Sequence, residues 1–567
     1  MVPHAKRQSR QSIRPAASRL AVALMAAAFA LPAAAQTQTR SEWITLGTGG
    51  GSVPSQRSCE DLVKLSLTNA TVTSAVSVAS GFKPPPNPHL PPTDIALPAF
   101  CRVQGIARPT SDSEIRFEVW LPVSGWNGKF EQVGNGSLAG TIPLFAMAEP
   151  LLRGFATAGT DDGHTGAPTD GSWAIGHPEK VIDFGYRAVH ETSVQAKAIL
   201  RGFYGKDPAQ SYFFGCSDGG REALMEAQRF PADFHGIVAG APANSWTQLM
   251  FRGEQNQRAM VDTASYIPPG KLAVLQAAAL AQCDALDGVK DGLIQNPRAC
   301  RFDPAVVLCK DADSPECLTA AQVEAAKKIY GPVIDSRTGD QISPGYSQGA
   351  EAVASTWAAW ITGPKAGATA VGPSVANSFF SGMVFEDPKW DPQTLNFSSD
   401  VKRTDDKLAS ILNSTNPNLS SFKARGGKLI QYHGWGDAAI PPQDSIDYFE
   451  SVQSVTGPTN DFYRLFMVPG MSHCGGGIGA NVFGNGLEAP DPDAAHDVVM
   501  ALDQWVVHAV APDQIIATGF VDGNPAKDVV MKRPLCPYPQ EAQYKGTGDT
   551  NSAASFTCKA PATSVGK

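Results

Sequence analysis

A glycine-rich turn between a strand-like and a helical segment constrains the fold of this chain more than any other feature of its sequence. The apolar segment 211–214 leads into Gly215-Cys216-Ser217-Asp218-Gly219-Gly220, and a helical pattern follows at 222–229. A Gly-x-Ser-x-Gly turn in this setting is typical of a nucleophile elbow, which lifts the serine hydroxyl clear of a sheet. The glycines are needed because side chains beside the serine would clash. We therefore predict that Ser217 is a nucleophile; the alternative is a purely structural turn.

The segments around this turn predict a parallel sheet with helices on both faces, which is an α/β architecture. Strand-like segments occur at 115–121, 129–133, 155–159, 211–214 and 236–241, and helical ones at 184–203 and 222–229. The alternation stops over residues 246–404 and resumes with the strand-like segment 428–432, and 567 residues exceed the roughly 250–300 that one core accommodates. We therefore expect an α/β core formed by residues 36–245 and 405–567, with an inserted domain at 246–404.

The N-terminal residues have the pattern of an export signal. Basic residues precede an apolar run at 20–31, and Ala33-Ala34-Ala35 fits a small-residue cleavage site. The run is shorter than the roughly 20 apolar residues of a membrane span, and no other segment reaches that length. We therefore expect residues 1–35 to be the signal peptide of a secreted or periplasmic protein without a membrane partner. In such a protein ten cysteines predict disulfides, and a formal charge of −8 without a basic block argues against a nucleic-acid partner.

A serine nucleophile needs a base and an acid, which follow it in the order Ser, Asp, His when the nucleophile occupies such an elbow. His473 lies in a loop after the strand-like segment 462–468, and loops beyond the carboxyl ends of strands hold the sites of such sheets. Asp437 is the first acidic residue after the strand-like segment 428–432, and Asp444 is the weaker alternative. We predict that His473 and Asp437 complete the site.

A cysteine lies next to the predicted nucleophile and another lies next to the predicted base. Cys216 precedes Ser217, and Cys474 follows His473. If Ser217 and His473 lie within hydrogen-bonding reach, their neighbours are forced close, and a disulfide needs Cα atoms only about 4.4–6.8 Å apart. We therefore predict a Cys216–Cys474 disulfide; the alternative is that each cysteine pairs elsewhere.

Backbone amides are the predicted donors to a negatively charged oxygen developing on a substrate. One is the N–H of Asp218, at the start of the helix after the nucleophile. The second must come from an early loop, for which Val133-Gly134-Asn135-Gly136-Ser137 is the glycine-rich candidate and Gly134 the predicted donor. An ordinary turn is the alternative.

Together these motifs resemble the tannase and feruloyl esterase family of α/β hydrolases. The resemblance rests on Gly215-Cys216-Ser217-Asp218-Gly219-Gly220-Arg221, His433-Gly434-Trp435-Gly436-Asp437, Ser472-His473-Cys474-Gly475, and Trp126-Asn127-Gly128-Lys129-Phe130 with Gly134-Asn135-Gly136. It implies an α/β-hydrolase fold with a large lid inserted between core strands, and a Ser217–His473–Asp437 triad bridged by the Cys216–Cys474 disulfide.

The resemblance also implies the substrate, small esters of aromatic carboxylic acids such as gallate and ferulate, which a serine triad would cleave through an acyl-enzyme. The same family includes mono(2-hydroxyethyl) terephthalate hydrolase, so cleavage of a terephthalate monoester is an alternative function. That substrate would need a cation for its free carboxylate, and no lid arginine can be assigned to a pocket. An alternative of another class is a non-catalytic binding protein on a hydrolase scaffold.

An acidic segment of the expected lid is a candidate calcium site. Asp284, Asp287 and Asp291 supply carboxylates, and the carbonyls of Val289 and Leu293 could complete the oxygen set that Ca²⁺ requires. The spacing is not that of an EF-hand, and a solvated acidic loop is the alternative; no cysteine–histidine cluster suits zinc. The resemblance implies a structural Ca²⁺ here, and the further disulfides Cys59–Cys101, Cys283–Cys300, Cys309–Cys317 and Cys536–Cys558.

Aromatic residues of the expected lid could stack on a planar acyl group. The candidates are Trp357, Trp360, Phe379, Phe380, Phe385 and Trp390. For each of them, packing in the lid's own core is the alternative.

Overall fold

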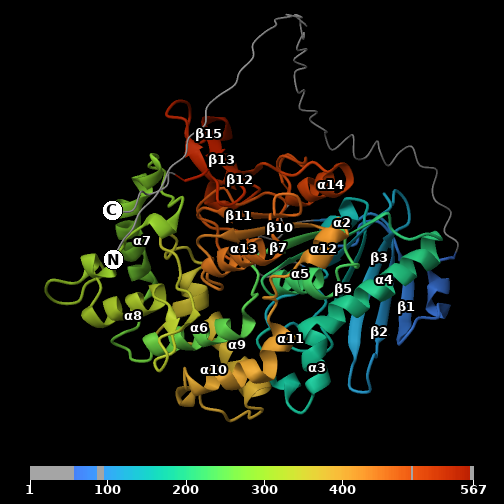
Figure 1. Ribbon diagram of the computed structural model, residues 1–567, viewed down its shortest axis with the longest axis horizontal. Coiled ribbons are helices and arrows are strands. Elements are labelled where there is room, and N and C mark those ends of the chain that lie inside the picture. The colour runs from blue at the N-terminus through green and yellow to red at the C-terminus, as the bar shows by residue number, and fades with distance from the viewer. Residues whose placement is uncertain (1–56, 86–94, 487–488, 562–567) are drawn as a thin grey trace, which may run out of the picture. The chain divides into compact units, whose positions relative to one another are not determined.

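A nine-stranded sheet forms the centre of the fold (Figure 1). The computed structural model describes residues 57–85, 95–486 and 489–561, so the predicted signal peptide lies outside the described residues. In spatial order the strands are β1 (Ala70–Val78), β2 (Phe100–Ala107), β3 (Ile115–Pro122), β5 (Ala156–Thr160), β4 (Lys129–Val133), β6 (Gln210–Cys216), β7 (Gly236–Gly240), β10 (Lys428–Gly434) and β11 (Tyr463–Val468). The pairs from β1 to β5 are antiparallel, and those from β5 to β11 are parallel.

Helices pack on both faces of the parallel strands because successive strand residues point to opposite sides. Phe213, Ile237 and Leu429 pack with α4 (Ala188–Tyr204), α5 (Asp218–Arg229) and α13 (Gln443–Thr456). Their chain neighbours Tyr212, Val238 and Ile430 pack on the other face with α14 (Val498–His508). The predicted α/β class is therefore confirmed, and the five expected strands correspond to β3–β7 within two residues.

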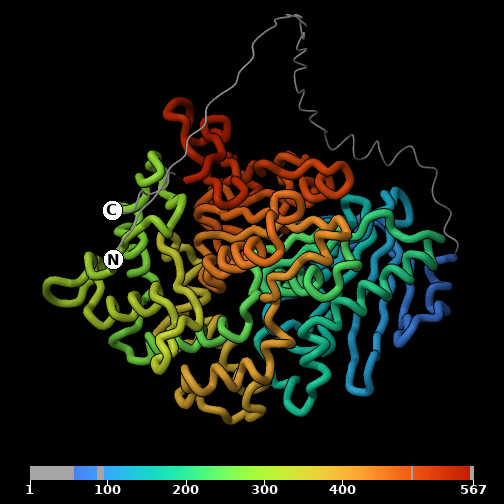
Figure 2. Tube along the Cα trace, in the orientation of Figure 1, coloured from blue at the N-terminus to red at the C-terminus, as the bar shows by residue number. Residues whose placement is uncertain are grey.

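The chain leaves the sheet after β7 and returns to pair directly with β7 as β10 (Figure 2). The main elements between them are α6 (Trp246–Ala259), α7 (Pro269–Cys283), α8 (Ala320–Tyr330), β8 (Val333–Ile334), β9 (Gln341–Ser343), α9 (Val371–Phe379), α10 (Ser399–Thr404), α11 (Ser410–Leu412) and α12 (Ser420–Ala424). One apolar cluster, which includes Leu275, Ile329 and Trp357, is formed largely by this insertion. The boundaries 246–404 of a separate lid domain stay a prediction.

The remaining elements are short. They are α2 (Ala148–Leu152), α3 (Pro178–Ile182), the hairpins of β12 (Ile515–Phe520) with β13 (Val529–Leu535) and of β14 (Glu541–Tyr544) with β15 (Phe556–Lys559), the π-helical turns η3 (Asp183–Arg187), η7 (Ala358–Thr362), η8 (Phe380–Val384) and η10 (Asp405–Ala409), and the 3-10 turns η1 (Glu60–Lys64), η2 (Ser172–Ala174), η4 (Asp284–Asp287), η5 (Pro297–Ala299), η6 (Pro304–Val307), η9 (Pro392–Thr394), η11 (Val521–Gly523) and η12 (Ala553–Ser555). None of the helices in the described ranges is both long and apolar enough to cross a membrane.

All ten cysteines are paired. The five disulfides are Cys59–Cys101, Cys216–Cys474, Cys283–Cys300, Cys309–Cys317 and Cys536–Cys558. These are the pairings expected from the sequence and the resemblance.

Candidate active site

Ser217 occupies the turn between β6 and α5 in a strained backbone conformation. Its φ is 69° and its ψ is −121°, a region that a non-glycine residue adopts only at a cost of about 1–3 kcal/mol. The flanking glycines leave no room for side chains, because a Cβ atom on Gly215 would lie 2.3 Å from the carbonyl oxygen of Gly219. A Cβ atom on Gly219 would lie 2.9 Å from the carbonyl oxygen of Asn135. The predicted elbow is thus present.

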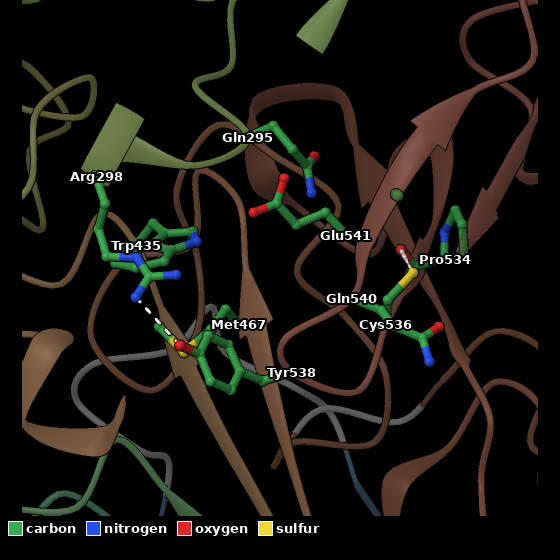
Figure 3. Close-up of a pocket in the computed structure, with 10 residues that line it drawn as sticks. Gln295, Arg298, Trp435, Met467, Pro534, Cys536, Tyr538, Gln540 and Glu541 are labelled. Atoms are coloured by element: carbon green, nitrogen blue, oxygen red, sulfur yellow. Dashed lines mark hydrogen bonds between the residues drawn. The ribbon is translucent and has the colours of Figure 1, made fainter. Parts of the chain in front are cut away.

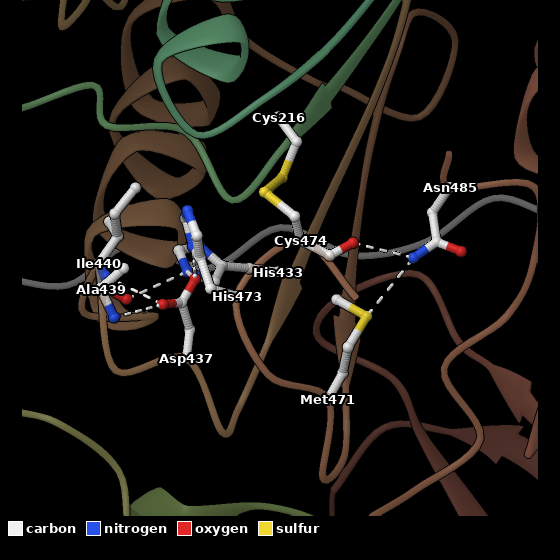
Figure 4. The surroundings of a disulfide bond; sticks show 9 residues. All are labelled: Cys216, His433, Asp437, Ala439, Ile440, Met471, His473, Cys474 and Asn485. Atoms are coloured by element: carbon white, nitrogen blue, oxygen red, sulfur yellow. Dashed lines mark hydrogen bonds and ion pairs between the residues drawn. A yellow bond between two sulfur atoms is a disulfide. The ribbon is translucent and has the colours of Figure 1, made fainter. Parts of the chain in front are cut away.

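Asp437 and His473 are in contact. Nδ1 of His473 lies 2.8 Å from Oδ2 of Asp437 (Figure 4). The other carboxylate oxygen accepts the backbone N–H groups of Ala439 at 2.8 Å and Ile440 at 3.0 Å. Burial alone would raise the pKa of Asp437, but the adjacent His473 and His433 hold that pKa well below its usual range. Asp437 is therefore an ionised partner that orients the imidazole.

Asp444, the alternative acid, does not contact a histidine. It lies in the first turn of α13, and burial raises its pKa to about 7. The structure thus places Asp437, rather than Asp444, beside His473.

The Cys216–Cys474 disulfide joins the elbow to the histidine loop. Its Cα atoms lie 5.9 Å apart although the residues are 258 positions apart in sequence (Figure 4). It therefore brings the residue before Ser217 against the residue after His473. The Ser217 hydroxyl itself forms no hydrogen bond to His473 among the described contacts, and triad hydrogen bonds of this kind often tighten only when substrate is bound.

A cavity opens at Ser217. It encloses about 480 Å³, part of it open to solvent, and its lining is Ser137, Ser217, Ala243, Trp246, Leu249, Met250, Gly253, Tyr346, Trp360, Gly372, Val375, Ala439 and Ile440. None of these lining residues carries a charge. The Trp360 ring also packs edge-on against the His473 ring, with centroids 5.0 Å apart, so the insertion forms one wall of the cavity and contacts the predicted base.

Of the six candidate stacking residues, only Trp360 lines this cavity. Trp357, Phe379 and Phe380 are buried in apolar clusters, and Phe385 stacks on Trp390 with ring centroids 5.1 Å apart. Trp246 and Tyr346 also line the cavity and were not predicted from the sequence. Trp246 could have been found by applying the strand-end rule to β7, since it follows soon after that strand.

Gly134 was predicted as a backbone donor, and this prediction is wrong. Its amide donates to the carbonyl of Phe214 at 2.8 Å, within the pairing of β4 and β6. Gly134 is instead required for packing, because a Cβ atom there would lie 2.7 Å from Cα of Gly219. The amides of Asp218, Gly136 and Ser137 meet no acceptor among the described residues, and Ser137 lines the cavity. The available backbone donors are thus the amide of Asp218 and, two and three residues after Gly134 in the predicted loop, those of Gly136 and Ser137.

The sequence profile described as tannase and feruloyl esterase matches residues 101–559, which is most of the chain. The chain belongs to the tannase and feruloyl esterase family. The resemblance seen in the motifs is therefore confirmed.

Relatives of this family member align over most of their length. An uncharacterized esterase of Xanthomonas campestris pv. campestris is 43% identical over 526 residues, which are 88% of this chain and 91% of the relative. The mono(2-hydroxyethyl) terephthalate hydrolase of Piscinibacter sakaiensis is 34% identical over 532 residues, 82% of this chain and 86% of the relative. The crystal structure of feruloyl esterase B from Aspergillus oryzae superposes with a TM-score of 0.79 at 31% identity, over 88% of this chain and 99% of that one.

The acidic loop with Asp284, Asp287 and Asp291 is compact. Resemblance to the tannase and feruloyl esterase family implies that it binds calcium. Both carboxylate oxygens of Asp284 accept backbone N–H groups, and a carboxylate oxygen of Asp291 accepts a hydrogen bond from Arg533 at 2.5 Å. Burial raises the pKa of Asp287 to about 6, with a further contribution from the other two carboxylates.

The predicted carbonyl ligands of this loop are free. Val289 and Leu293 are each 5% exposed, and neither carbonyl accepts a hydrogen bond from a described residue. Buried carbonyls without a donor are uncommon, and hard oxygen donors are the ligands that Ca²⁺ prefers. The oxygen types are therefore those that Ca²⁺ prefers, but Asp284, Asp287 and Asp291 are not among the described carboxylate groups whose oxygens lie within 4.8 Å of one another. Calcium binding by this loop stays a prediction.

A second cavity lies away from Ser217. Its lining includes Arg298, Trp435, Met467, Tyr538 and Glu541, and Arg298 donates to the Tyr538 hydroxyl at 3.2 Å (Figure 3). It contains none of the predicted catalytic residues.

Proposed function

We propose that this chain is a serine carboxylic ester hydrolase that forms an acyl-enzyme on Ser217. Membership of the tannase and feruloyl esterase family makes it an ester hydrolase. The serine mechanism is supported by one arrangement above all: the disulfide from Cys216 to Cys474 holds the elbow beside the hydrogen-bonded His473 and Asp437.

In this mechanism His473 accepts the proton of the Ser217 hydroxyl while Oγ attacks the ester carbonyl carbon. Asp437 orients the imidazole and stabilises the cation that forms. The protonated His473 then donates to the departing alcohol, and a water molecule activated by the same histidine hydrolyses the acyl-enzyme. The amide of Asp218, with that of Gly136 or Ser137, stabilises the tetrahedral oxyanion, an effect of about 3–4 kcal/mol for one donor.

The proposed substrate is an ester of an aromatic carboxylic acid that carries no second charged group, as in feruloyl esterases and tannases. Trp246, Tyr346 and Trp360 supply aromatic surface around the serine, which suits a planar acyl group. An uncharged lining offers no partner for a second, ionised carboxyl group. A terephthalate monoester is therefore the less favoured candidate, despite 34% identity to the Piscinibacter hydrolase.

The remaining features of the proposal concern location and stability. We propose that residues 246–404 act as a lid, that residues 1–35 direct export, and that the acidic loop binds a structural Ca²⁺. Five disulfides are typical of proteins from oxidising compartments, which supports export. Asp284, Asp287 and Asp291, with the carbonyls of Val289 and Leu293, would hold the ion, which would brace the loop without taking part in ester cleavage.

The test uses a fluorophosphonate probe and three substrates. The protein is expected to be labelled at Ser217, and Ser217→Ala is expected to lose labelling and ester turnover while keeping the wild-type circular dichroism spectrum. Methyl ferulate or methyl gallate is expected to be cleaved with a higher kcat/KM than mono(2-hydroxyethyl) terephthalate. Unchanged turnover by Ser217→Ala would contradict the mechanism, and a protein that is not labelled would favour a binding function.

A further inference from the structure

Three carboxyl groups are packed together directly behind Ser217. Asp162 lies on the turn after β5, and Asp218 and Glu222 lie on α5. Each offers a carboxylate oxygen within 4.8 Å of the others, and their exposed fractions are 0%, 0% and 1%. Arg221 supplies a positive charge to Asp218, with its Nε 2.5 Å from Oδ1. The other guanidinium nitrogens donate to backbone carbonyls, so the charge of Asp162 and Glu222 is not balanced by a direct ion pair.

Several oxygens of this cluster lack hydrogen-bond donors. Both carboxyl oxygens of Asp162, Oε1 of Glu222 and Oδ2 of Asp218 are buried without a partner. A buried carboxylate oxygen without a donor is costly. A single proton between Asp162 and Glu222 would pair two of these oxygens at once, and it would also remove one of the clustered negative charges.

Glu222 connects this cluster to the loop after β4. Its Oε2 accepts the backbone N–H of Asn135 at 3.0 Å, and the Asn135 carbonyl accepts the N–H of Gly219 at 2.9 Å. The Asn135 side chain donates to the carbonyl of Thr160 at 2.8 Å. Asn135 is therefore held on both sides of its backbone, immediately before the free amides of Gly136 and Ser137.

We propose that Asp162 is protonated at neutral pH and donates a hydrogen bond to Glu222, and that this carboxyl–carboxylate pair positions the Asn135–Ser137 loop beside Ser217. The inference rests on the proposed function, because it gives the loop its role as an oxyanion donor. Asp162 and Glu222 are positioning residues, since neither reaches the reacting atoms.

The surroundings of Asp162 favour its neutral form. Burial raises its pKa well above the usual value, and the carboxylates of Glu222 and Asp218 act in the same direction. Other titratable groups nearby are Asp161 and His164 on the same turn, and Asp183 of η3, which is paired with Arg187 at 2.5 Å. The remaining anion at Glu222 accepts the backbone N–H of Asn135, which stabilises its charge.

The first test measures protonation and does not depend on catalysis. In the difference between the infrared spectra of the wild type and Asp162→Asn at pH 8, the carbonyl band of one protonated carboxyl group is expected, because the variant lacks this group while the other buried carboxyl groups contribute equally to both spectra. Asp437→Asn is the matched control, because Asp437 is also buried but its pKa lies well below the usual value, so its replacement should remove no such band. An Asp162→Asn spectrum identical to that of the wild type would overturn the proposal. So would a tightly bound metal ion, at one per chain by elemental analysis, that this variant loses.

The second test measures positioning. Glu222→Gln keeps an acceptor for Asn135 and a donor for Asp162, so its kcat for methyl ferulate is expected to stay within about threefold of wild type. Glu222→Ala is expected to lower kcat at least tenfold with little change in KM. Equal kcat values for Glu222→Ala and the wild type would overturn the positioning role. Failure of the proposed function would appear separately, as turnover retained by Ser217→Ala with the infrared result unaffected.

Discussion

His433 contacts the same carboxylate oxygen of Asp437 that His473 contacts. Its Nε2 lies 3.2 Å from Oδ2 of Asp437, and its Nδ1 lies 2.7 Å from Oγ of Ser445. His433 is fully buried, so this ring supports the acid from within the protein interior. The motif His433-Gly434-Trp435-Gly436-Asp437 therefore carries both the acid and its support.

Replacing the acid with its amide is expected to remove most of the activity. Asp437→Asn keeps the size of the side chain but cannot stabilise the imidazolium, and kcat should fall by about 10³–10⁴-fold. His433→Ala should lower kcat less, by about tenfold, and should reduce the free energy of unfolding by about 1–3 kcal/mol, because Asp437 and Ser445 lose a buried partner. Steady-state kinetics measure kcat, and urea unfolding measures the free energy of unfolding, for each variant. Equal kcat values for the two variants would contradict the assignment of roles.

The depressed pKa of Asp437 predicts the direction of one pH effect. An unfolded aspartate titrates near pH 3.9, and the folded value lies well below it. The carboxylate therefore contributes stability above about pH 4, and this contribution is lost as the pH falls through the folded-state pKa. The stability difference between wild type and Asp437→Asn should shrink when unfolding is measured at pH 3 instead of pH 7. A difference that grows toward pH 3 would disprove this.

Removal of the Cys216–Cys474 disulfide is expected to affect activity and stability together. The double variant to alanine should lower kcat, because the elbow and the histidine loop are no longer tied. It should also lose about 5 kcal/mol of stability in the chain-entropy model, given a separation of 258 residues. The matched control replaces Cys309 and Cys317, whose separation of 8 residues predicts a smaller loss and unchanged kcat. Wild-type kcat in the Cys216–Cys474 variant would show that the bridge is structural only.

A positive charge placed in the cavity should shift its selectivity. Leu249 lines the cavity and is half-buried, so Leu249→Arg can offer a guanidinium to a free carboxylate on the substrate. The ratio of kcat/KM for mono(2-hydroxyethyl) terephthalate to that for methyl ferulate should rise at least tenfold. Leu249→Met is the uncharged control and should leave the ratio unchanged. An equal rise in both variants would exclude charge as the cause.

Calcium removal should destabilise the protein without altering its chemistry at saturating substrate. In calorimetry, Tm should fall on addition of a chelator and recover with Ca²⁺, since a ligand at 100 times its Kd stabilises by about 2.7 kcal/mol. Asp287→Asn should have a lower Tm that Ca²⁺ no longer raises. Mg²⁺ serves as the control ion. A wild-type Tm that does not respond to either treatment would refute the calcium proposal.

Sequence was sufficient for the features that depend on local pattern. Short motifs were enough to predict the turn around Ser217, the strands from β3 to β7, and the disulfide between Cys216 and Cys474. The antiparallel strands β1 and β2 were not predicted. β1 is rich in Ala, Ser and Thr and buries only Val72 and Ala75, and β2 has Arg102 and Gln104 between its apolar residues, so neither has the apolar run of a core strand. The Gly134 error has a similar origin, since the use of its amide by Phe214 depends on strand pairing rather than on composition.

Burial of polar residues was the largest difference between sequence and structure. The sequence of α5 carries Asp218, Arg221, Glu222 and Glu226, a composition expected of an exposed helix, yet every residue from 218 to 227 is buried. The helix packs against β6 and β7 of the sheet and is also in contact with α4, η3 and, from the insertion, α12, which explains that burial. The clustering of carboxyl groups behind Ser217 depends on tertiary packing and could therefore not be predicted from the residue pattern.

The direct pairing of β7 with β10 has an evolutionary consequence. Ser217, Asp437 and His473 follow the strands β6, β10 and β11 of the sheet, whereas much of the cavity wall belongs to the segment between β7 and β10, including Trp246 and Trp360. Substitutions, insertions or deletions in that segment can exchange one acid for another while the proton relay stays fixed. Related enzymes can therefore diverge in the esters that they accept while keeping the same catalytic mechanism.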